Sequence, residues 1–542
     1  MIWKWLGIMA LLLFLFEGVE ANQAPPKVTV DVKRFGEGTC SGTFVAHDLP
    51  HITTVKSERI RLYESNGSGL GINDLNGDGL QDIVLANLDG PSTLLWNEGD
   101  LNFRKTEIDL APRRDVNLVD VNGDGLIDIV LTGQATTPAL WQNVGNELSK
   151  LGSLKGVSHL AYSMDWADVD RDGDLDLVTA SYDADLEKTL KDSFLLGGGA
   201  GVFYYENRDG QFVGKRLANK AQALTVFMND FNDDGQLDLA VGNDFAFPDQ
   251  YWTFDNGQWM PFQPFMITTY STMSFDAGDI NNDGQSEFFA TDMQPYSTDP
   301  QTQKQWQPLL EQLMKKPRLT NDPQTIENIL QRVDTQDGYT NIARTMGLSA
   351  TGWSWSAQFG DLNSDGYLDL YVVNGMIALE LFGQLPNSEL VEENQARRNL
   401  NGTRFVPAPE WQLNSTRSGR GMTMADMDND GDLDIVVNNL MSAAQLFENQ
   451  LCEGHNLIVQ LRQPAIQNHD QIGARIILHT ATGTYQRQIR ASSGYLSGNP
   501  TQVHFGLPDG SQIEDLEVQW TDGVISHLSA IQVDTLLTVA RE

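Results

Sequence analysis

The chain has 542 residues, with 36 lysines and arginines against 73 aspartates and glutamates, and a formal net charge of −37. It is too long for one ordinary domain, so more than one is expected. The acidic excess argues against nucleic acids and anionic membranes as partners, because both attract clusters of lysine and arginine.

Residues 1–21 are typical of a signal peptide. Lys4 precedes an apolar run from Leu6 to Phe16, and Val19-Glu20-Ala21 suits cleavage by signal peptidase. The run is shorter than the roughly 20 residues that cross a bilayer, although an uncleaved anchor is the alternative. We therefore expect removal of residues 1–21 and a secreted or periplasmic protein with no membrane insertion.

Cysteine occurs only at Cys40 and Cys452. An exported chain meets an oxidising compartment, where a disulfide is permitted. Cys40 precedes the first repeat described below and Cys452 follows the last, so a disulfide would join the start of a ring to its end. Two separately buried thiols are the alternative, and the sequence leaves the choice open.

Seven acidic segments share the template Asp-x-Asp/Asn-x-Asp-Gly-x-x-Asp/Glu. A short apolar run follows each, as in Ile83-Val-Leu-Ala86 and Leu370-Tyr-Val-Val373, which is typical of a buried strand. Turns such as Asp209-Gly210 then indicate a hairpin. The shorter spacings between templates match those of four-stranded propeller blades. The sequence therefore predicts an all-β fold, with a seven-bladed β-propeller over residues 22–452.

A segment at about 293–345 carries no template and interrupts the repeats. Helices are expected at residues 303–314, at least after Pro308, and at residues 326–332. An insertion on one face of a propeller either caps the fold or shapes a binding site. We favour the cap.

The oxygen-bearing side chains of each template have a spacing that fits calcium, which takes about 6 to 8 oxygen ligands. Positions 1, 3 and 5 supply Asp or Asn oxygens, position 7 a backbone carbonyl and position 9 a carboxylate, while glycine at position 6 permits a sharp turn. Carboxylates this close together repel unless a cation lies among them. Magnesium retains waters, and zinc prefers cysteine or histidine. The sequence predicts about seven Ca²⁺ ions, held by Asp74, Asn76, Asp78, Asp82, Asp120, Asn122, Asp124, Asp128, Asp168, Asp170, Asp172, Asp176, Asp230, Asn232, Asp234, Asp238, Asp279, Asn281, Asp283, Glu287, Asp361, Asn363, Asp365, Asp369, Asp426, Asp428, Asp430 and Asp434.

Residues 453–542 alternate apolar and polar side chains in short runs, for example Leu516-Glu-Val-Gln-Trp520. Asp509-Gly510 and Asp522-Gly523 mark turns between such runs. The pattern predicts a small β-sandwich-like domain or a barrel. Several histidines fall here, and we expect them to be structural.

The acidic loops resemble the FG-GAP or VCBS repeats of integrin α-chain propellers and of many exported bacterial proteins, and Phe359-Gly360 carries the name-giving pair. The C-terminal residues resemble an ASPIC/UnbV domain in Gln471-Ile-Gly-Ala-Arg475, Ser492-Ser-Gly-Tyr-Leu-Ser497 and His504-Phe-Gly-Leu507. A propeller followed by this domain is the layout of the cartilage acidic protein family. The resemblance implies an exported, calcium-binding propeller protein.

Searches for catalytic motifs find no glycine-rich phosphate loop, GxSxG, HExxH or CxxC pattern. Trp353 and Trp355 could stack on a sugar, but at alternating strand positions they are expected in the core. We expect a monomeric, non-catalytic binding or adhesion module with a protein or glycan ligand. The alternatives are a carbohydrate-active lyase or hydrolase and a periplasmic assembly factor.

Overall fold

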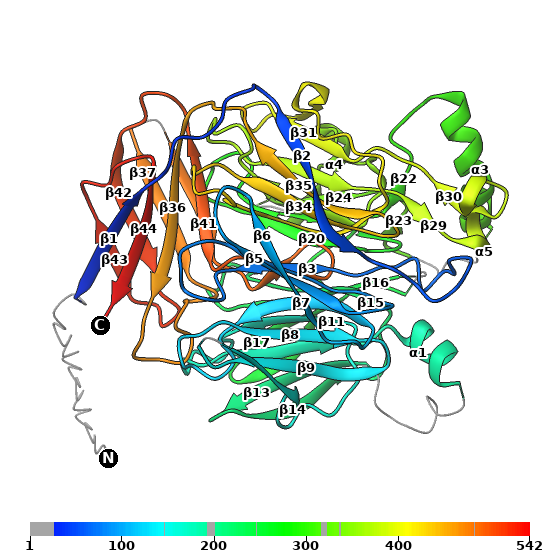
Figure 1. The fold of residues 1–542 in the computed structure, drawn as a ribbon, viewed down its shortest axis with the longest axis horizontal. Coiled ribbons are helices and arrows are strands. Elements are labelled where there is room, and N and C mark those ends of the chain that lie inside the picture. The colour runs from blue at the N-terminus through cyan, green and yellow to red at the C-terminus, as the bar shows by residue number, and fades with distance from the viewer. Residues whose placement is uncertain are drawn as a thin grey trace, which may run out of the picture.

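The structure, a computed structural model, describes residues 27–145, 147–191, 201–244, 247–315, 322–334, 338–481 and 483–542. The expected signal peptide over residues 1–21 lies outside the described residues. Strands dominate the described chain and form a large body of sheets with a smaller, C-terminal body beside it (Figure 1). The all-β prediction is confirmed.

Seven antiparallel units of four strands form the larger body. The first four units are β3 (Leu70–Asn73), β4 (Asp82–Leu85), β5 (Ser92–Asn97) and β6 (Phe103–Ile108); β7 (Arg113–Val119), β8 (Asp128–Gly133), β9 (Thr136–Asn143) and β10 (Leu148–Ser153); β11 (Ser163–Ala167), β12 (Asp176–Ala180), β13 (Val202–Arg208) and β14 (Gln211–Ala218); and β15 (Ala223–Asn229), β16 (Asp238–Asn243), β17 (Gln250–Asp255) and β18 (Gln258–Phe262). The last three are β20 (Phe275–Gly278), β21 (Glu287–Ala290), β24 (Ile329–Asp334) and β25 (Gly338–Asn341); β27 (Ser356–Gly360), β28 (Asp369–Val373), β31 (Gln395–Asn399) and β32 (Phe405–Pro407); and β33 (Gly419–Ala425), β34 (Asp434–Asn439), β35 (Ala443–Asn449) and β2 (Phe44–Ile52).

The first strand of each unit lies against the first strand of the next. These contacts run through β3, β7, β11, β15, β20, β27 and β33, and β33 returns to β3. The strands therefore form a closed ring around one axis, which is a β-propeller fold. Each unit packs face to face between two neighbours, so the apolar runs predicted as strands are buried on both faces, as Ile83, Val84 and Leu85 are.

The ring is closed by two strands that are far apart in the sequence. Strand β2 precedes all the repeats, yet it pairs with β35 as the outermost strand of the seventh unit. Beside this pair, Cys40 and Cys452 form a disulfide with their Cα atoms 5.6 Å apart. Of the two alternatives that the sequence left open, the disulfide is therefore the correct one.

The predicted insertion contains one long helix and also part of the fifth unit. Helix α3 (Pro300–Met314) includes Pro308, and its fully buried Trp306 donates a hydrogen bond to Glu392. The prediction of a second helix at residues 326–332 is wrong. Residues Ile329–Asp334 form β24, because the fifth unit needs a third strand and β24 supplies it by pairing with β21.

Several short elements lie outside the four-stranded units. They are α1 (Asp183–Leu190), β19 (Thr268–Thr269), β22 (Met293–Gln294), β23 (Gln324–Thr325), α4 (Ala343–Met346), β26 (Gly352–Trp353), β29 (Met376–Ile377), α5 (Leu379–Phe382), the 3₁₀ turns Pro386–Ser388 and Pro409–Trp411, and β30 (Glu389–Leu390). Helices α1, α3 and α5 lie on the face of the propeller away from the smaller body (Figure 1). Trp353 packs near Trp306 and Phe382, and Trp355 near Tyr495, so both belong to the core as expected.

The smaller body, here called the tail domain, packs two sheets face to face around buried residues such as Leu478 and Trp520. One sheet has the order β1 (Val28–Arg34), β44 (Thr535–Arg541), β36 (His455–Arg462) and β41 (Gln502–Leu507); the other has the order β38 (Thr484–Gln488), β37 (Arg475–Thr480), β42 (Ile513–Gln519) and β43 (Ile525–Leu528). We expected residues 22–452 to form the propeller. That boundary needs correction, because β1 pairs with β44 and so completes the tail domain.

A segment of the tail domain, Ser492–Asn499, enters the axis of the propeller and is called the axial segment below. It contains β39 (Ser492–Ser493) and β40 (Ser497–Gly498), and β40 pairs in parallel with β3. The axial segment also contacts the first strands of the other six propeller units. They are Ser492 Oγ to Asp165 of β11 (2.7 Å), Thr225 Oγ1 of β15 to the Gly494 carbonyl (3.1 Å), Gly494 N to Phe275 of β20 (2.8 Å), Tyr495 N to Ser356 of β27 (3.1 Å), Met422 N of β33 to Ser497 Oγ (3.1 Å), and Gly498 against the Val116 carbonyl of β7.

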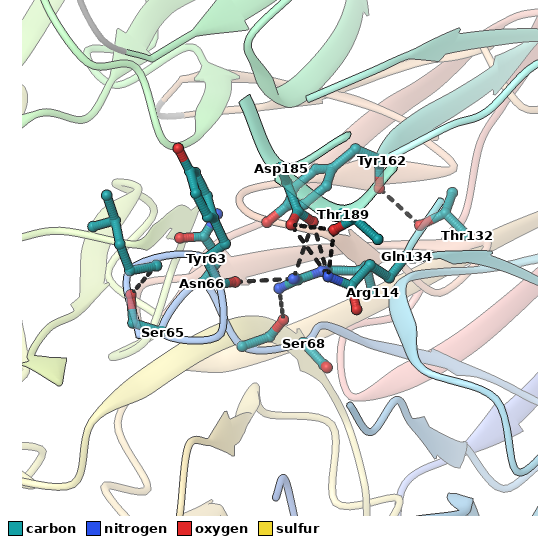
Figure 2. Close-up of polar contacts among 12 residues, drawn as sticks. Tyr63, Ser65, Asn66, Ser68, Arg114, Thr132, Gln134, Tyr162, Asp185 and Thr189 are labelled. Carbon is teal, nitrogen blue, oxygen red and sulfur yellow. Dashed lines mark hydrogen bonds and ion pairs between the residues drawn. The ribbon is translucent and has the colours of Figure 1, made fainter. Parts of the chain in front are cut away.

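At the far end of the axis, Tyr495 reaches a buried polar cluster. Its hydroxyl lies 2.8 Å from that of Tyr162 and donates to the Asn66 carbonyl at 2.9 Å. Arg114 donates to the carbonyls of Gly67 and Tyr63 and lies 3.5 Å from Asp185 of α1 (Figure 2). The axial segment therefore links the tail domain to the opposite face of the propeller.

Removing the disulfide by Cys40→Ser should destabilise the protein by about 2–4 kcal/mol, because the bond closes a very long loop of the unfolded chain. Denaturant unfolding under non-reducing conditions measures the change. The double variant with Cys452→Ser should match the single variant, since either one breaks the same bond. An unfolding midpoint equal to that of the wild type would contradict this expectation.

Gly69→Ala should displace the axial segment, because an added Cβ would lie 1.5 Å from the Leu496 carbonyl oxygen. Overpacking of this kind costs about 1–3 kcal/mol or more. Thermal unfolding and limited proteolysis of the tail domain test the expectation. Gly36→Ala is the control, since its Cβ would meet nothing closer than 3.5 Å, and equal behaviour of the two variants would count against the proposed packing.

Candidate metal centre

Each acidic template connects the first strand of its unit to the second. Its ninth residue begins the second strand, as Asp82 begins β4 and Asp434 begins β34. The loops therefore lie between strands, as predicted, and all at one end of the ring. Tail residues lie against these loops, with Ile466 near Gly173 and Tyr485 near Gly366, so this is the face that the tail domain covers.

The first aspartate of the template holds the turn together. In the first loop, Asp74 Oδ1 accepts from Gly77 N at 2.7 Å and Asp74 Oδ2 accepts from Gly79 N at 2.8 Å. Gly79 has φ +83°, a conformation that suits glycine and disfavours other residues. The same bond from the sixth-position glycine recurs at Asp120, Asp230, Asp279, Asp361 and Asp426.

The ninth-position carboxylate also has a structural task that the sequence reading did not include. Asp82 accepts from Leu75 N at 3.1 Å and from Asn97 N of β5 at 2.8 Å. The hydrogen bond from the backbone N of the second loop residue to the ninth-position carboxylate is present in all seven loops. Burial raises the pKa of Asp82 to about 7. These side chains thus fix each loop to its own sheet.

The third and seventh loops concentrate the most negative charge. Carboxylate oxygens of Asp168, Asp170 and Asp172 all lie within 4.8 Å of one another, and the same holds for Asp426, Asp428 and Asp434. Burial, with Asp172 and Asp170 nearby, raises the pKa of Asp168 to about 7. An assembly of three carboxylates with hard oxygen donors is the arrangement that calcium selects.

Buried side-chain oxygens without partners are most numerous in the same two loops, and one each also occurs at Asp238 of the fourth loop and Asn363 of the sixth. Among the described residues, one oxygen each of Asp168, Asp174, Asp426 and Asp432 has no hydrogen-bond partner. A buried, unsatisfied carboxylate oxygen is costly, so a cation fits this donor set. Asp174 and Asp432 occupy template position 7, where the sequence predicted only a backbone carbonyl as a ligand. The presence of five acids in each of these two loops was the sequence signal for the additional carboxylates.

Basic side chains lie against several of the other loops. Arg475 of the tail domain lies 3.0 Å from Asp230, and His469 lies 3.5 Å from Asp120. In the fifth loop, Arg332 of β24 lies 2.7 Å from Glu287. The two arginines offset part of the charge that a metal ion would otherwise neutralise, so the seven loops are not equivalent.

Asparagines on the third strands join neighbouring units, which the sequence reading missed. Asn399 Nδ2 donates to the Leu368 carbonyl of its own loop at 3.0 Å and to the Ile280 carbonyl of the preceding unit at 2.8 Å. Asn97, Asn143 and Asn449 make the same bond to the preceding unit. An Asn recurs at this position in five of the seven units, with Asp255 and Asp334 in the other two, and this recurrence was the available signal.

The closed ring of antiparallel sheets with one acidic loop in each makes this a β-propeller protein. Sequence comparison matches an FG-GAP-like repeat family at residues 74–118, 120–179, 230–290 and 383–437, and the ASPIC and UnbV family at residues 465–542. The chain is therefore an FG-GAP repeat protein with a C-terminal ASPIC and UnbV domain, as the resemblance suggested. No curated protein sequence matches it.

Similar solved structures include BBS1N in complex with ARL6DN, at 10% identity and a TM-score of 0.42, covering 75% of this chain and 96% of that one. The WD40 domain of Toxoplasma gondii coronin matches at 13% identity and a TM-score of 0.40, covering 77% and 89%. The Neurospora crassa Pan2 WD40 domain matches at 8% identity and a TM-score of 0.40, covering 76% and 98%.

None of the helices in the described part of the chain is long and apolar enough to cross a membrane.

Asn399→Ala should destabilise the propeller by about 1–3 kcal/mol, because two buried carbonyls lose their donor. Denaturant unfolding measures the loss. Asn219→Ala, at an exposed position, is the control and should leave the midpoint unchanged. Equal midpoints for the two variants would show that the bond between units contributes nothing.

Proposed function

We propose that this chain is an exported, calcium-loaded, seven-bladed β-propeller that acts as a non-catalytic binding or adhesion module. The observation that carries the calcium assignment is the set of buried, unpartnered carboxylate oxygens in the third and seventh loops. All seven loops keep the template, so about seven ions are expected, with these two sites the tightest.

Calcium would be held in the third loop by Asp168, Asp170, Asp172 and Asp174. In the seventh loop it would be held by Asp426, Asp428, Asp430, Asp432 and Asp434. When bound, the ion supplies positive charge that removes repulsion among these carboxylates. Because both loops lie on the face covered by the tail domain, the metal serves stability and assembly.

The binding role is supported by the division of the propeller into two unlike faces. One face carries the acidic loops and the tail domain, and the other carries α1, α3 and α5 (Figure 1). Insertions on a rigid scaffold commonly form binding surfaces. We propose a protein or glycan as the ligand of a secreted or periplasmic monomer.

Removal of calcium should lower the melting temperature by roughly 10 °C or more, since an ion that binds only the folded state stabilises it by mass action. Thermal unfolding with and without a chelator measures the shift, and metal analysis of the purified protein gives the ion content. A zinc- or magnesium-only content, or melting that is insensitive to chelation, would refute the calcium assignment.

Asp172→Asn tests the third loop by itself. It should lower the calcium content by about one ion per chain and reduce the melting temperature, because one charged ligand is lost. Asp255→Asn, outside the templates on a hairpin, is the matched control and should leave the ion content at the wild-type value.

Binding to a glycan array without release of unsaturated or reducing ends separates the binding module from a lyase or hydrolase.

A further inference from the structure

A cavity of about 550 Å³ lies between the loop face of the propeller and the tail domain. It is bounded by units four to seven and by strands β37, β38 and β41. The exposed residues Asp233 and Gln285 are part of its lining, so it opens to solvent between the two bodies. Its size is in the range of sites for small organic ligands.

Two arginines that line the cavity each keep one buried N–H group without a hydrogen-bond partner, Arg487 at Nη2 and Arg490 at Nε. Asp361 and Asp279 act on Arg487 at longer range, and Asp276 and Asp165 act on Arg490. Arg487 donates to the carbonyls of His504 and Gln486, and Arg490 donates to the Ala277 carbonyl and to Asn229. Among the described residues, neither guanidinium lies within 4.0 Å of a carboxylate. Burial lowers the pKa of both from its usual range. Cations removed from water in this way favour an added anionic partner.

Four of the carboxylates that line the same cavity accept hydrogen bonds within the protein. Asp230 pairs with Arg475, and Asp276 accepts from Phe359 N at 2.6 Å. Asp361 and Asp426 accept from the glycines of their own loops at 2.8 and 3.0 Å. The unpartnered N–H groups of Arg487 and Arg490 are therefore the donors that remain available to a ligand.

The rest of the lining suits a hydroxylated molecule. Gln358, Gln486, Gln488, Gln502 and Asn499 place side-chain amides along it. Each amide both donates and accepts hydrogen bonds, as a sugar hydroxyl does. Phe359 and Tyr339 add aromatic rings, and a flat apolar ring offers a surface for the face of a sugar.

We propose that this cavity binds an acidic sugar, with its carboxylate on Arg487 and Arg490 and its hydroxyls on the surrounding amides. Charge-assisted bonds from arginine to a carboxylate are among the strong hydrogen bonds in proteins and give specificity for an anion. The inference rests on the proposed binding function and names a ligand class for it.

The test uses the full-length mature protein in calcium-containing buffer. Isothermal titration calorimetry compares α-1,4-linked digalacturonate with the same disaccharide in which both carboxylates are converted to amides. The acid should bind at least about tenfold more tightly than the diamide. No binding of the acid, or affinities for the two compounds within about threefold, would overturn the proposal.

Arginine variants locate the site. Arg490→Gln and Arg487→Gln should each weaken digalacturonate binding by about tenfold or more, whereas Arg34→Gln on the exposed β1 strand should leave it unchanged. Unchanged affinity in folded forms of both cavity variants would place the ligand elsewhere and overturn the proposal. The comparison of acid with diamide needs only the wild-type protein, so it decides the matter even if both variants fail to fold.

Failure of this inference is distinguishable from failure of the proposed function. Metal analysis and chelator sensitivity on the same sample report the calcium assignment without any sugar. Chromatography of the disaccharide after incubation reports turnover, which would contradict the non-catalytic role. Preference for the acid over the diamide supports the cavity proposal in either case.

Discussion

Repulsion among carboxylates at one end of the ring is the constraint on which the rest of this structure depends. The seven templates place aspartates at positions that converge on one turn, and the third and seventh turns bury some of their oxygens without partners. Buried like charges destabilise a fold unless cations or protons neutralise them. Every element that covers this end must therefore either supply a positively charged side chain or leave space for a bound cation.

The tail domain meets this constraint in part by supplying basic side chains of its own. Arg475 lies against the fourth loop and His469 against the second, and both come from sequence far beyond the repeats. The third and seventh loops have the most acids and receive no comparable ion pair among the described residues. Under the calcium proposal, basic side chains of the protein neutralise some loops, and metal ions are needed most where such side chains are lacking.

Much of this architecture could be predicted from the sequence, because each repeat carries a local pattern that indicates its loop and its strands. The templates, the buried strands that follow them and the two-sheet tail domain all follow from short patterns that depend on neighbouring residues. The errors came from pairing between distant segments. Residues 329–332 were expected in a helix but lie in β24, which pairs across the insertion with β21. Strand β1 lies in the tail domain because it pairs with β44.

The candidate site was predictable to the same extent and for the same reason. The template acids were identifiable, whereas the neutralising Arg475 and the asparagine bonds between units depend on tertiary placement. The axial segment illustrates this limit most clearly. Its small and polar residues carry no sign that they contact all seven first strands, since that requires the ring to exist already.

The placement of β1 and β2 has a consequence for how the protein comes into being. These strands leave the ribosome first, yet β1 pairs with β44 and β2 with β35. Domains usually fold as units in the order of their synthesis, but here the propeller cannot close before β35 has been made, and the tail domain cannot be completed before β44 has been made. Both bodies must therefore stay open through most of the synthesis of these residues.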